Sequence, residues 1–231
     1  MMNTDHFERL PREFFGRPST TVAPELLGCV LWRDSPAGLV AVRLVEVEAY
    51  QGAADPASHA YRGQTPRNGV MFGPPGYAYV YFTYGMHFCV NLVCQPPGQA
   101  EAVLIRAGEV VEGTDLARER RGGKDRDLAR GPGRLCQALA IDRTLDGADV
   151  CGPDSPLGIA RPPVDGRAPA APGGGEISTG PRVGISQATD RPWRYWLAGD
   201  NYVSSFRPMK PRAARAKPVS GPGSKDGTMH R

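Results

Sequence analysis

Apolar residues in this chain gather in short runs separated by turn sequences, a pattern that predicts β-strands joined by hairpins. Residues 29–33 and 39–50 are rich in Val and Leu, and the Asp-Ser-Pro-Ala-Gly sequence between them has turn chemistry. Residues 77–84 and 86–93 form two more apolar runs, which only Gly85 separates. The pattern therefore predicts two hairpins, the second with a tight connection.

Helices are indicated at three places. Residues 19–27 begin with hydroxyl residues that can cap a helix, and we expect Pro24 near the first turn. Residues 112–121 and 134–141 have helical patterns bordered by Gly or Pro. A further strand is predicted at residues 102–107, so helices and strands occur in mixed order.

The second half of the chain changes in composition. Pro, Gly and Ala crowd residues 142–176, which predicts an irregular surface segment rather than a core element. Core-forming residues return at 182–185 and 193–197, and the apolar content collapses after Pro208. We therefore expect one folded domain in residues 1–207 and a basic, disordered tail in residues 208–231.

Charge and cysteine content narrow the class of protein. The net charge is +4, with basic residues concentrated at 118–134 and from Lys210 onward. An excess of this size fits a DNA-binding surface and a solvated basic face equally well. The five cysteines predict buried free thiols in a reducing cytoplasm. No run of eighteen apolar residues occurs, so we expect no contact with a membrane.

One strand gathers two carboxylates and a phenol. Alternation places Glu46, Glu48 and Tyr50 on one face of the strand. The opposite face is expected to hold Val45, Val47 and Ala49. A carboxylate beside an aromatic slot suits activation of a water molecule, although most strand glutamates face solvent. His59 follows nine residues later and by itself is more often a surface histidine than a catalytic one.

The second predicted hairpin is rich in tyrosine. Tyr77, Tyr79 and Tyr81 share one face, where they could stack on a flat, electron-poor ring or simply pack in the core. Tyr84 lies beside Gly85 at the expected tip, where little core is available to an aromatic side chain. A protruding aromatic can act as a wedge between base steps of DNA.

Polar residues near these strands could contact a nucleotide. Asn91 and Arg106 follow in the next strands and offer amide and guanidinium donors. Residues 65–68 and 131–134 are turns with exposed polar groups and one arginine each. Phosphate contact and an ordinary surface turn explain these sequences equally well.

Several signatures are missing from the sequence. The zinc-deaminase pattern is absent, and the Cys89 and Cys94 pair has no partner pair that would complete a zinc site. No Walker sequence and no dinucleotide glycine fingerprint occurs. The residues thus favour hydrolysis without a metal or a cofactor.

Several motifs in order resemble the alkyladenine (3-methyladenine) DNA glycosylase family of the mammalian type. They are Arg12-Glu13-Phe14-Phe15, Val45-Glu46-Val47-Glu48-Ala49-Tyr50, Gln64-Thr65-Pro66-Arg67-Asn68, Tyr79-Val80-Tyr81-Phe82-Thr83-Tyr84-Gly85-Met86, Gly131-Pro132-Gly133-Arg134-Leu135-Cys136-Gln137-Ala138-Leu139 and Tyr202-Val203-Ser204. The resemblance implies a single α+β domain with a curved antiparallel β-sheet, flanking helices and a protruding β-hairpin that enters the minor groove. It also implies a monofunctional enzyme of base excision repair that flips alkylated or deaminated purines out of duplex DNA. The 3-methyladenine, 7-methylguanine and hypoxanthine class would be hydrolysed to leave an abasic site.

The resemblance also implies residue roles. Glu48 matches the glutamate that activates water, Arg106 the arginine that positions this water, and Tyr84 the intercalating tyrosine. Tyr50, His59 and Tyr81 match the positions that sandwich the flipped base, and Asn91 matches the asparagine that excludes the amine of guanine. The expected DNA contacts are Tyr84, Gly85, Thr65, Arg67, Met71, Arg134 and Ser204.

The chain departs from the family pattern at His87, which replaces an aromatic residue, and in residues 142–176. Two other functions remain open: a non-catalytic lesion-binding protein that flips bases, and a bifunctional glycosylase-lyase. The lyase would need an amine nucleophile, and the motif segments contain no lysine. We expect a monomer that acts on double-stranded DNA containing damaged purines in the cytoplasm, at the nucleoid if bacterial, or in the nucleus if eukaryotic.

Overall fold

The computed structural model describes residues 7–83, 85–161 and 175–206. Its strands are β1 (Val30–Ser35), β2 (Gly38–Gln51), β3 (Ala78–Thr83), β4 (His87–Cys94), β5 (Glu101–Glu112), β6 (Leu157–Ala160), β7 (Ile177–Gly180) and β8 (Arg194–Leu197). Its α-helices are α1 (Arg12–Phe15), α2 (Ser19–Glu25), α3 (Thr114–Arg121) and α4 (Pro132–Ala138). Short 3₁₀ turns are η1 (Gly52–Ala54), η2 (Gly69–Phe72), η3 (Asp125–Asp127) and η4 (Arg143–Leu145).

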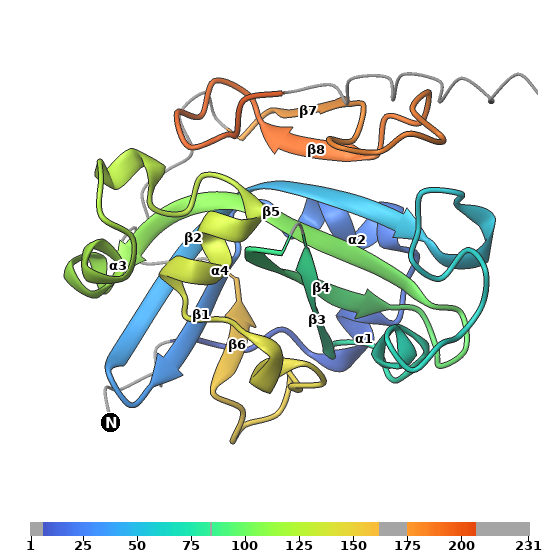
Figure 1. The fold of residues 1–231 in the computed structure, drawn as a ribbon, viewed down its shortest axis with the longest axis horizontal. Coiled ribbons are helices and arrows are strands. Elements are labelled where there is room, and N and C mark those ends of the chain that lie inside the picture. The colour runs from blue at the N-terminus through green and yellow to red at the C-terminus, as the bar shows by residue number, and fades with distance from the viewer. Residues whose placement is uncertain (1–6, 84, 162–174, 207–231) are drawn as a thin grey trace, which may run out of the picture.

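The described strands form one curled sheet in the order β3-β4-β5-β2-β1-β6, with β8 also paired to β2 and β7 to β8 (Figure 1). All of these pairings are antiparallel. The expected α+β domain with a curved antiparallel sheet and flanking helices is thereby confirmed. The β1–β2 hairpin agrees with its prediction, and so does the pairing of β3 with β4. Tyr84, between these two strands, lies outside the described residues.

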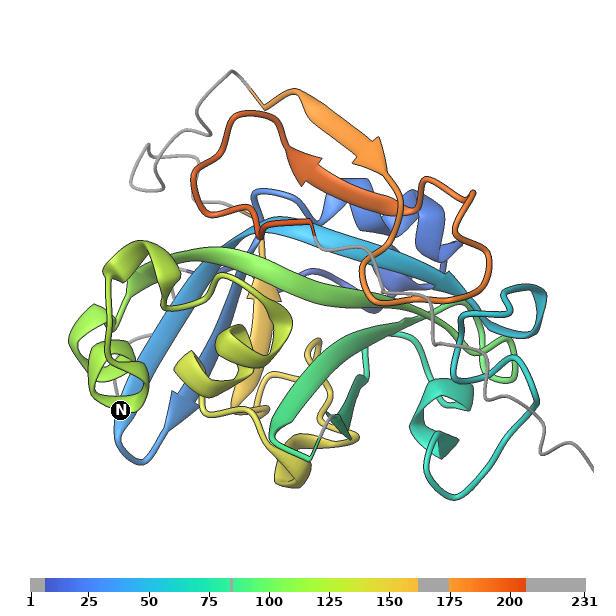
Figure 2. The same ribbon diagram turned by 45° about the horizontal axis from the view of Figure 1, so that its top comes forward.

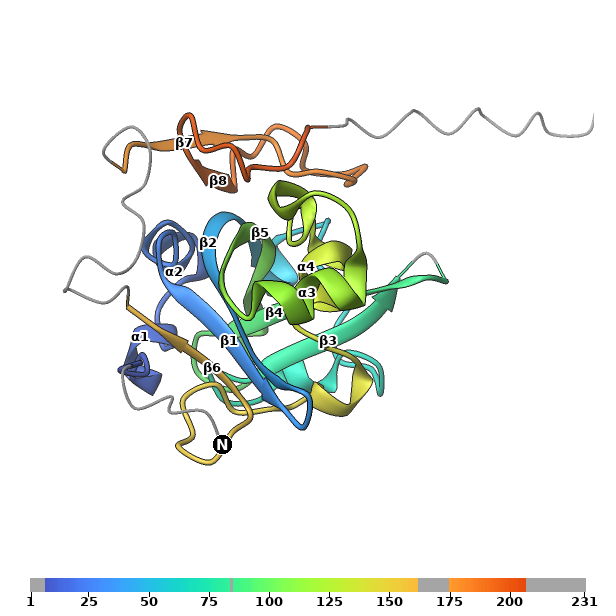
Figure 3. The same ribbon diagram turned by 90° about the vertical axis from the view of Figure 1, so that its left-hand side faces the viewer.

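The main apolar core fills the concave side of the curled sheet, which wraps around α4 (Figures 2 and 3). Leu135, Cys136 and Leu139, from α4 and the residue after it, are fully buried there. Phe15 from α1 and Val22 from α2 belong to the same cluster. Because the core takes every second residue of β2 to β5, the alternate residues face the other side, where they form the site described below.

A β-bulge lies in the middle of β2. Leu44 pairs with Gly108 and Glu46 with Ala107, so Val45 is the extra residue, and Arg106 is the extra residue one step further along β5. The bulge moves Val45 away from Val47 and Ala49, into a separate cluster with Ala107 and Leu197. The expectation that these three apolar residues share one face is therefore wrong for Val45.

The prediction of an irregular surface segment is wrong for residues 157–160, whereas residues 142–156 contain only the short turn η4 and include several exposed positions. β6 is buried at all four positions and pairs with the edge of β1, and Leu145 and Val150 belong to the main core. The Pro and Gly residues close to β6 limit the length of its pairing but do not prevent it, because an edge strand needs hydrogen bonds on one side only. Residues 162–174 of this predicted segment lie outside the described residues.

The predictions for residues 19–27, for Arg134 and for residues 182–185 also need correction. Pro24 is the sixth residue of α2, and Ser19 does not cap this helix but donates from its hydroxyl to the backbone oxygen of Tyr50 and the carboxylate of Glu101. Arg134 lies in the first turn of α4 rather than in a surface turn. Of the predicted core segment at residues 182–185, only Arg182 is buried. The predicted tail, residues 208–231, lies outside the described residues.

Candidate active site

Strand register lines up polar residues across the face of the sheet that the core does not use. Tyr79 on β3 pairs with Asn91 on β4, Asn91 pairs with Leu104 on β5, and Leu104 pairs with Glu48 on β2. Arg194 on β8 continues this row beyond Glu48. Directly paired residues have side chains on the same face of a sheet, so residues distant in sequence meet in one row.

Glu48 is fully buried and held by three donors. The backbone N–H of Val183 donates to Oε1 at 2.7 Å, and Nη1 of Arg106 lies 3.1 Å from the same oxygen. The Tyr50 hydroxyl donates to Oε2 at 2.8 Å. Burial and the neighbouring Glu48 carboxylate raise the pKa of Tyr50 well above its usual range, so this hydroxyl stays protonated as a donor.

A second buried carboxylate, Glu46, anchors the arginine that faces Glu48. Nε of Arg106 and Nε of Arg194 both donate to Oε1 of Glu46, at 2.7 and 2.8 Å. The backbone N–H of Ser204 donates to Oε2, also at 2.7 Å. Burial raises the pKa of Glu46, but the charges and hydrogen bonds of Arg106 and Arg194 outweigh burial and lower it overall. Glu46 is thus an ionised support for Arg106.

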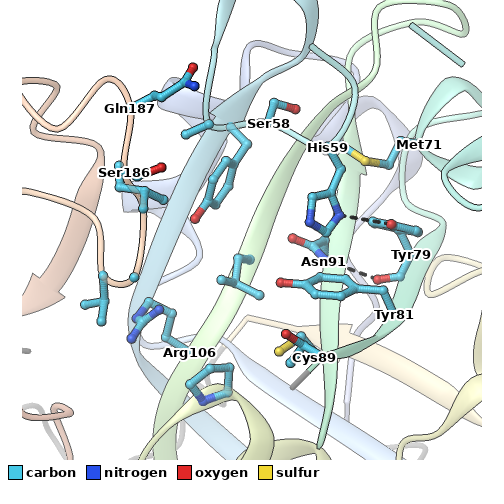
Figure 4. Close-up of a pocket in the computed structure, with 18 of the residues that line it drawn as sticks. Ser58, His59, Met71, Tyr79, Tyr81, Cys89, Asn91, Arg106, Ser186 and Gln187 are labelled. Carbon is cyan, nitrogen blue, oxygen red and sulfur yellow. Dashed lines mark hydrogen bonds between the residues drawn. The ribbon is translucent and has the colours of Figure 1, made fainter. Parts of the chain in front are cut away.

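A cavity of about 520 Å³ opens over this row, within the size range of small-molecule sites. Figure 4 shows Tyr81 and His59 on one side of it, and Ser186 and Gln187 across from them. The complete lining comprises Tyr50, Pro56, Ala57, Ser58, His59, Met71, Tyr79, Tyr81, Thr83, Cys89, Asn91, Leu104, Arg106, Pro132, Val183, Gly184, Ile185, Ser186 and Gln187.

Three aromatic rings build the wall on the β3 side. The rings of Tyr79 and Tyr81 stack with centroids 5.5 Å apart, and the His59 ring meets Tyr81 edge-on at 4.6 Å. Nδ1 of His59 lies 3.1 Å from the Tyr79 hydroxyl. Burial and then the positive charge of Arg67 lower the pKa of His59, which favours a neutral imidazole at pH 7. The wall therefore presents uncharged aromatic surface to the cavity.

The predicted base-binding residues come together. Tyr50, His59, Tyr81 and Asn91 all line the cavity, as does Arg106, and Glu48 lies directly behind Tyr50 and Arg106. Tyr50 is separated from Tyr81 by two strands, β4 and β5, so the two phenol rings come from opposite sides of the cavity.

The predicted DNA contacts fall in several places. Arg134 and Ser204 line a second depression of about 270 Å³, which adjoins the cavity through the shared Arg106. Thr65 is exposed, and its N–H and hydroxyl both donate to the side-chain oxygen of Asn68. Four predicted contacts remain, and one of them, Tyr84, lies outside the described residues. Arg67 donates to the Phe82 backbone oxygen at 3.3 Å, Met71 is 3% exposed and lines the cavity, and Gly85 is exposed with a φ of 67°.

Sequence reasoning missed the segment that closes the cavity opposite the tyrosines. Residues 183–187 line it, and Val183 supplies a donor to Glu48. Arg182 holds this segment through paired hydrogen bonds to Asp55. Arg182 and Val183 belong to no recognisable motif, and the apolar pattern of residues 182–185 indicated only a core element. Cys89 also lines the cavity and is a free, buried thiol.

Within the described ranges, no three His, Cys, Asp or Glu side chains lie where they could jointly hold a metal ion. None of the helices in these ranges has the length and apolar content that crossing a lipid bilayer requires. The arrangement of Glu48 offers a buried carboxylate that could accept a proton, directly behind two residues of an aromatic cavity, Tyr50 and Arg106.

Comparison with known proteins shows the family of the chain. The sequence matches the methylpurine-DNA glycosylase (MPG) family over residues 13–201. A protein of Streptomyces avermitilis named "Putative 3-methyladenine DNA glycosylase" is 53% identical over 210 residues, which cover 89% of this chain and 95% of the relative. A protein of the same name from Frankia casuarinae is 54% identical, over 86% of this chain and 93% of its own length. Another from Burkholderia lata is 52% identical, over 84% of this chain and 90% of its own length.

Fold, site and comparisons define the class of protein: a monofunctional DNA glycosylase, which acts on damaged DNA in base excision repair. The chain belongs to the methylpurine-DNA glycosylase family.

Proposed function

We propose that this enzyme flips alkylated and deaminated purines, the 3-methyladenine, 7-methylguanine and hypoxanthine class, out of duplex DNA and into the cavity. Hydrolysis of the N-glycosidic bond would then leave an abasic site. The observation that carries the proposal is the buried Glu48, held by three donors directly behind Tyr50 and Arg106, which line the aromatic cavity. The names of the relatives support 3-methyladenine as one of the substrates.

The cavity wall suits a flat, positively charged ring. An alkylated ring nitrogen makes the purine cationic, and stacking on the faces of Tyr50 and Tyr81 then gains about 0.5–2 kcal/mol beyond ordinary stacking. A neutral His59 does not repel such a base. Asn91, whose side-chain N–H donates to the Tyr79 backbone oxygen at 3.3 Å, would lie against the base edge and exclude the exocyclic amine of an uncharged guanine by crowding it. The positive charge of 7-methylguanine would offset this cost through stacking on the tyrosine rings.

In the chemical step, Glu48 accepts a proton from a water molecule whose oxygen bonds to the anomeric carbon of the sugar. The bond from that carbon to the purine nitrogen breaks, and its electron pair leaves with the base. A cationic purine leaves as a neutral molecule, whereas a neutral purine also needs a proton. Because Glu48 has no exposed surface, water reaches its oxygen only when Tyr50 or residues 183–187 move. Arg106 would orient this water.

The DNA backbone would lie across the depression next to the cavity. Arg130, Arg134 and Ser204 line this depression, and guanidinium groups bind phosphate oxygens well. Thr65, Arg67 and Gly85 would make further contacts, with Tyr84 filling the space that the flipped base leaves. We expect the enzyme to work as a monomer, since one chain contains every group that this mechanism uses.

Base release tests the function directly. Chromatography of methylated duplex DNA incubated with the enzyme should show free 3-methyladenine or 7-methylguanine. A lesion-binding protein would bind the duplex and release no base. Covalent trapping of the DNA with borohydride would instead indicate a lyase mechanism and contradict hydrolysis by water.

Glu48→Gln tests the role of the carboxylate. The amide cannot accept the proton, so excision in a single-turnover assay should stop while lesion binding persists. Glu109→Gln is a matched control, because Glu109 is also a strand carboxylate paired with an arginine, Arg43, but does not line the cavity. Full excision by Glu48→Gln would refute its assigned role.

A further inference from the structure

An ion pair between Arg182 and Asp55 lies next to the ring of Tyr50, and neither of its two residues lines the cavity. The side chains of Arg182 and Asp55 are both fully buried, and Nη1 and Nη2 of Arg182 donate to the two carboxylate oxygens of Asp55, Nη2 at 2.9 Å. Asp55 is fixed in turn, since it accepts from the backbone N–H of Ala57 at 3.2 Å. Such a bidentate pair holds the guanidinium plane in one orientation.

Arg182 reaches the site by three routes. Its guanidinium carbon lies 4.5 Å from the centroid of the Tyr50 ring, and Nη1 donates to the backbone oxygen of Ala49 at 3.0 Å. The next residue in the chain, Val183, donates its N–H to Oε1 of Glu48 at 2.7 Å. Fixing Arg182 therefore fixes the ring that lines the cavity, the strand that carries it and one donor to the buried carboxylate.

We propose that Arg182, clamped by Asp55, is a positioning residue that sets the geometry of Tyr50 and of Glu48 for excision. The inference rests on the proposed function, since it assigns Arg182 a part in base release. Arginine suits the position because its planar fork binds a carboxylate with two hydrogen bonds while its face stacks on an aromatic ring, and lysine does neither.

Stability alone is a poor reason for this ion pair. Buried ion pairs contribute little compared with well-packed apolar residues. The buried Nε of Arg182 also lacks a hydrogen-bond partner within the described residues, which costs free energy. The arrangement thus sacrifices some stability to hold one geometry next to Glu48.

The test separates the rate of the reaction from the amount of folded enzyme. Arg182→Gln combined with Asp55→Asn removes both charges together, so no buried charge is left unpaired. In single turnover with excess enzyme on a 7-methylguanine duplex, the rate constant should fall at least tenfold, while the amplitude still reports the active fraction. An unchanged rate constant with a lower melting temperature would show a purely structural role and overturn the proposal.

Arg12 and Asp149 give a control ion pair outside the cavity, although this pair is partly exposed rather than buried. They form an ion pair with a distance of 2.6 Å, and Arg12 also donates to a backbone oxygen and lies over a tyrosine ring, that of Tyr77, which does not line the cavity. Arg12→Gln with Asp149→Asn should leave the rate constant within twofold of the wild type. An equal slowing by this control would also overturn the proposal, because the effect would then not be specific to Arg182.

If the variant that carries both Arg182→Gln and Asp55→Asn does not fold, Arg182→Lys serves as a second test, because it leaves the buried charges balanced. It keeps the positive charge beside Asp55 but loses the fork and the stacking, so the rate constant should stay at least tenfold low. A wild-type rate would show that charge alone matters and contradict the proposal. Absence of base release by the wild type itself would instead refute the proposed function.

Discussion

Nη1 of Arg106 lies 3.1 Å from Oε1 of Glu48, while Nε of the same guanidinium donates to Glu46 at 2.7 Å. One arginine thus joins two carboxylates that alternate along β2. Arg106 can do so because it is the extra residue of a bulge in β5, where the pairing with β2 passes from Ala107 directly to Ile105.

Arg106→Lys should slow excision by about a hundredfold, since one ammonium group cannot serve both carboxylates and also orient a water molecule. Duplex binding should change much less. Single-turnover kinetics and a binding titration measure the two effects. Arg43→Lys is the control, because Arg43 is also buried and paired with two carboxylates, those of Glu109 and Asp200, but does not line the cavity. Equal rates for Arg106→Lys and the wild type would contradict the role of Arg106.

The protonation state of His59 should control the binding of cationic bases. Its pKa is lowered from 6.5 by burial and by Arg67, so His59 is neutral at pH 7 and gains a proton only as the pH falls through this lowered value. Below this lowered pKa, the imidazolium of His59 should repel a cationic purine. The affinity for a 7-methylguanine duplex should therefore fall at acidic pH more than that for a hypoxanthine duplex, and His59→Gln should remove this difference.

The same shift affects stability. Because the pKa of His59 is lower in the folded protein, the unfolded chain binds more protons between the two pKa values. The contribution of His59 to stability is fully present above pH 6.5 and is lost as the pH falls through the folded-state pKa. Denaturant titrations of the wild type and of His59→Gln should differ in their pH dependence only in this acidic range.

Tyr84→Ala should weaken binding to a lesion duplex by about 1–3 kcal/mol, the value of one base stacked on an aromatic ring. It should also reduce flipping, which 2-aminopurine fluorescence next to the lesion reports. Met86→Ala is the control, since Met86 is 71% exposed close to the same β3–β4 connection. A normal fluorescence change in Tyr84→Ala would contradict the wedge.

Arg134→Ala should weaken binding to all duplexes alike. If Arg134 contacts one phosphate, the slope of log affinity against log salt should become shallower by about 0.9. Arg143→Ala serves as the control, because Arg143 is comparably exposed on η4 but lines neither the cavity nor the adjoining depression. The same slope for Arg134→Ala and the wild type would place the DNA elsewhere.

Much of the site was predictable because strand alternation is local. The face shared by Glu46, Glu48 and Tyr50 follows from a period of two residues, and so does the face shared by Tyr79 and Tyr81. The side on which Val45 lies was not predictable, since a bulge depends on how β5 pairs with β2. The burial of β6 was missed for a related reason, because its composition says nothing of the open edge of β1 that it pairs with.

The sequence by itself therefore determined the residue types, the strands and the faces that carry the carboxylate and the phenols. Tertiary structure alone decided what holds them in place: Arg182 reaches Asp55 across 127 residues, and Ser204 reaches Glu46 across 158. The physical reason is that periodicity along a strand encodes only its own two faces. Contacts between distant segments depend on how the sheet curls and on which segment covers its polar face.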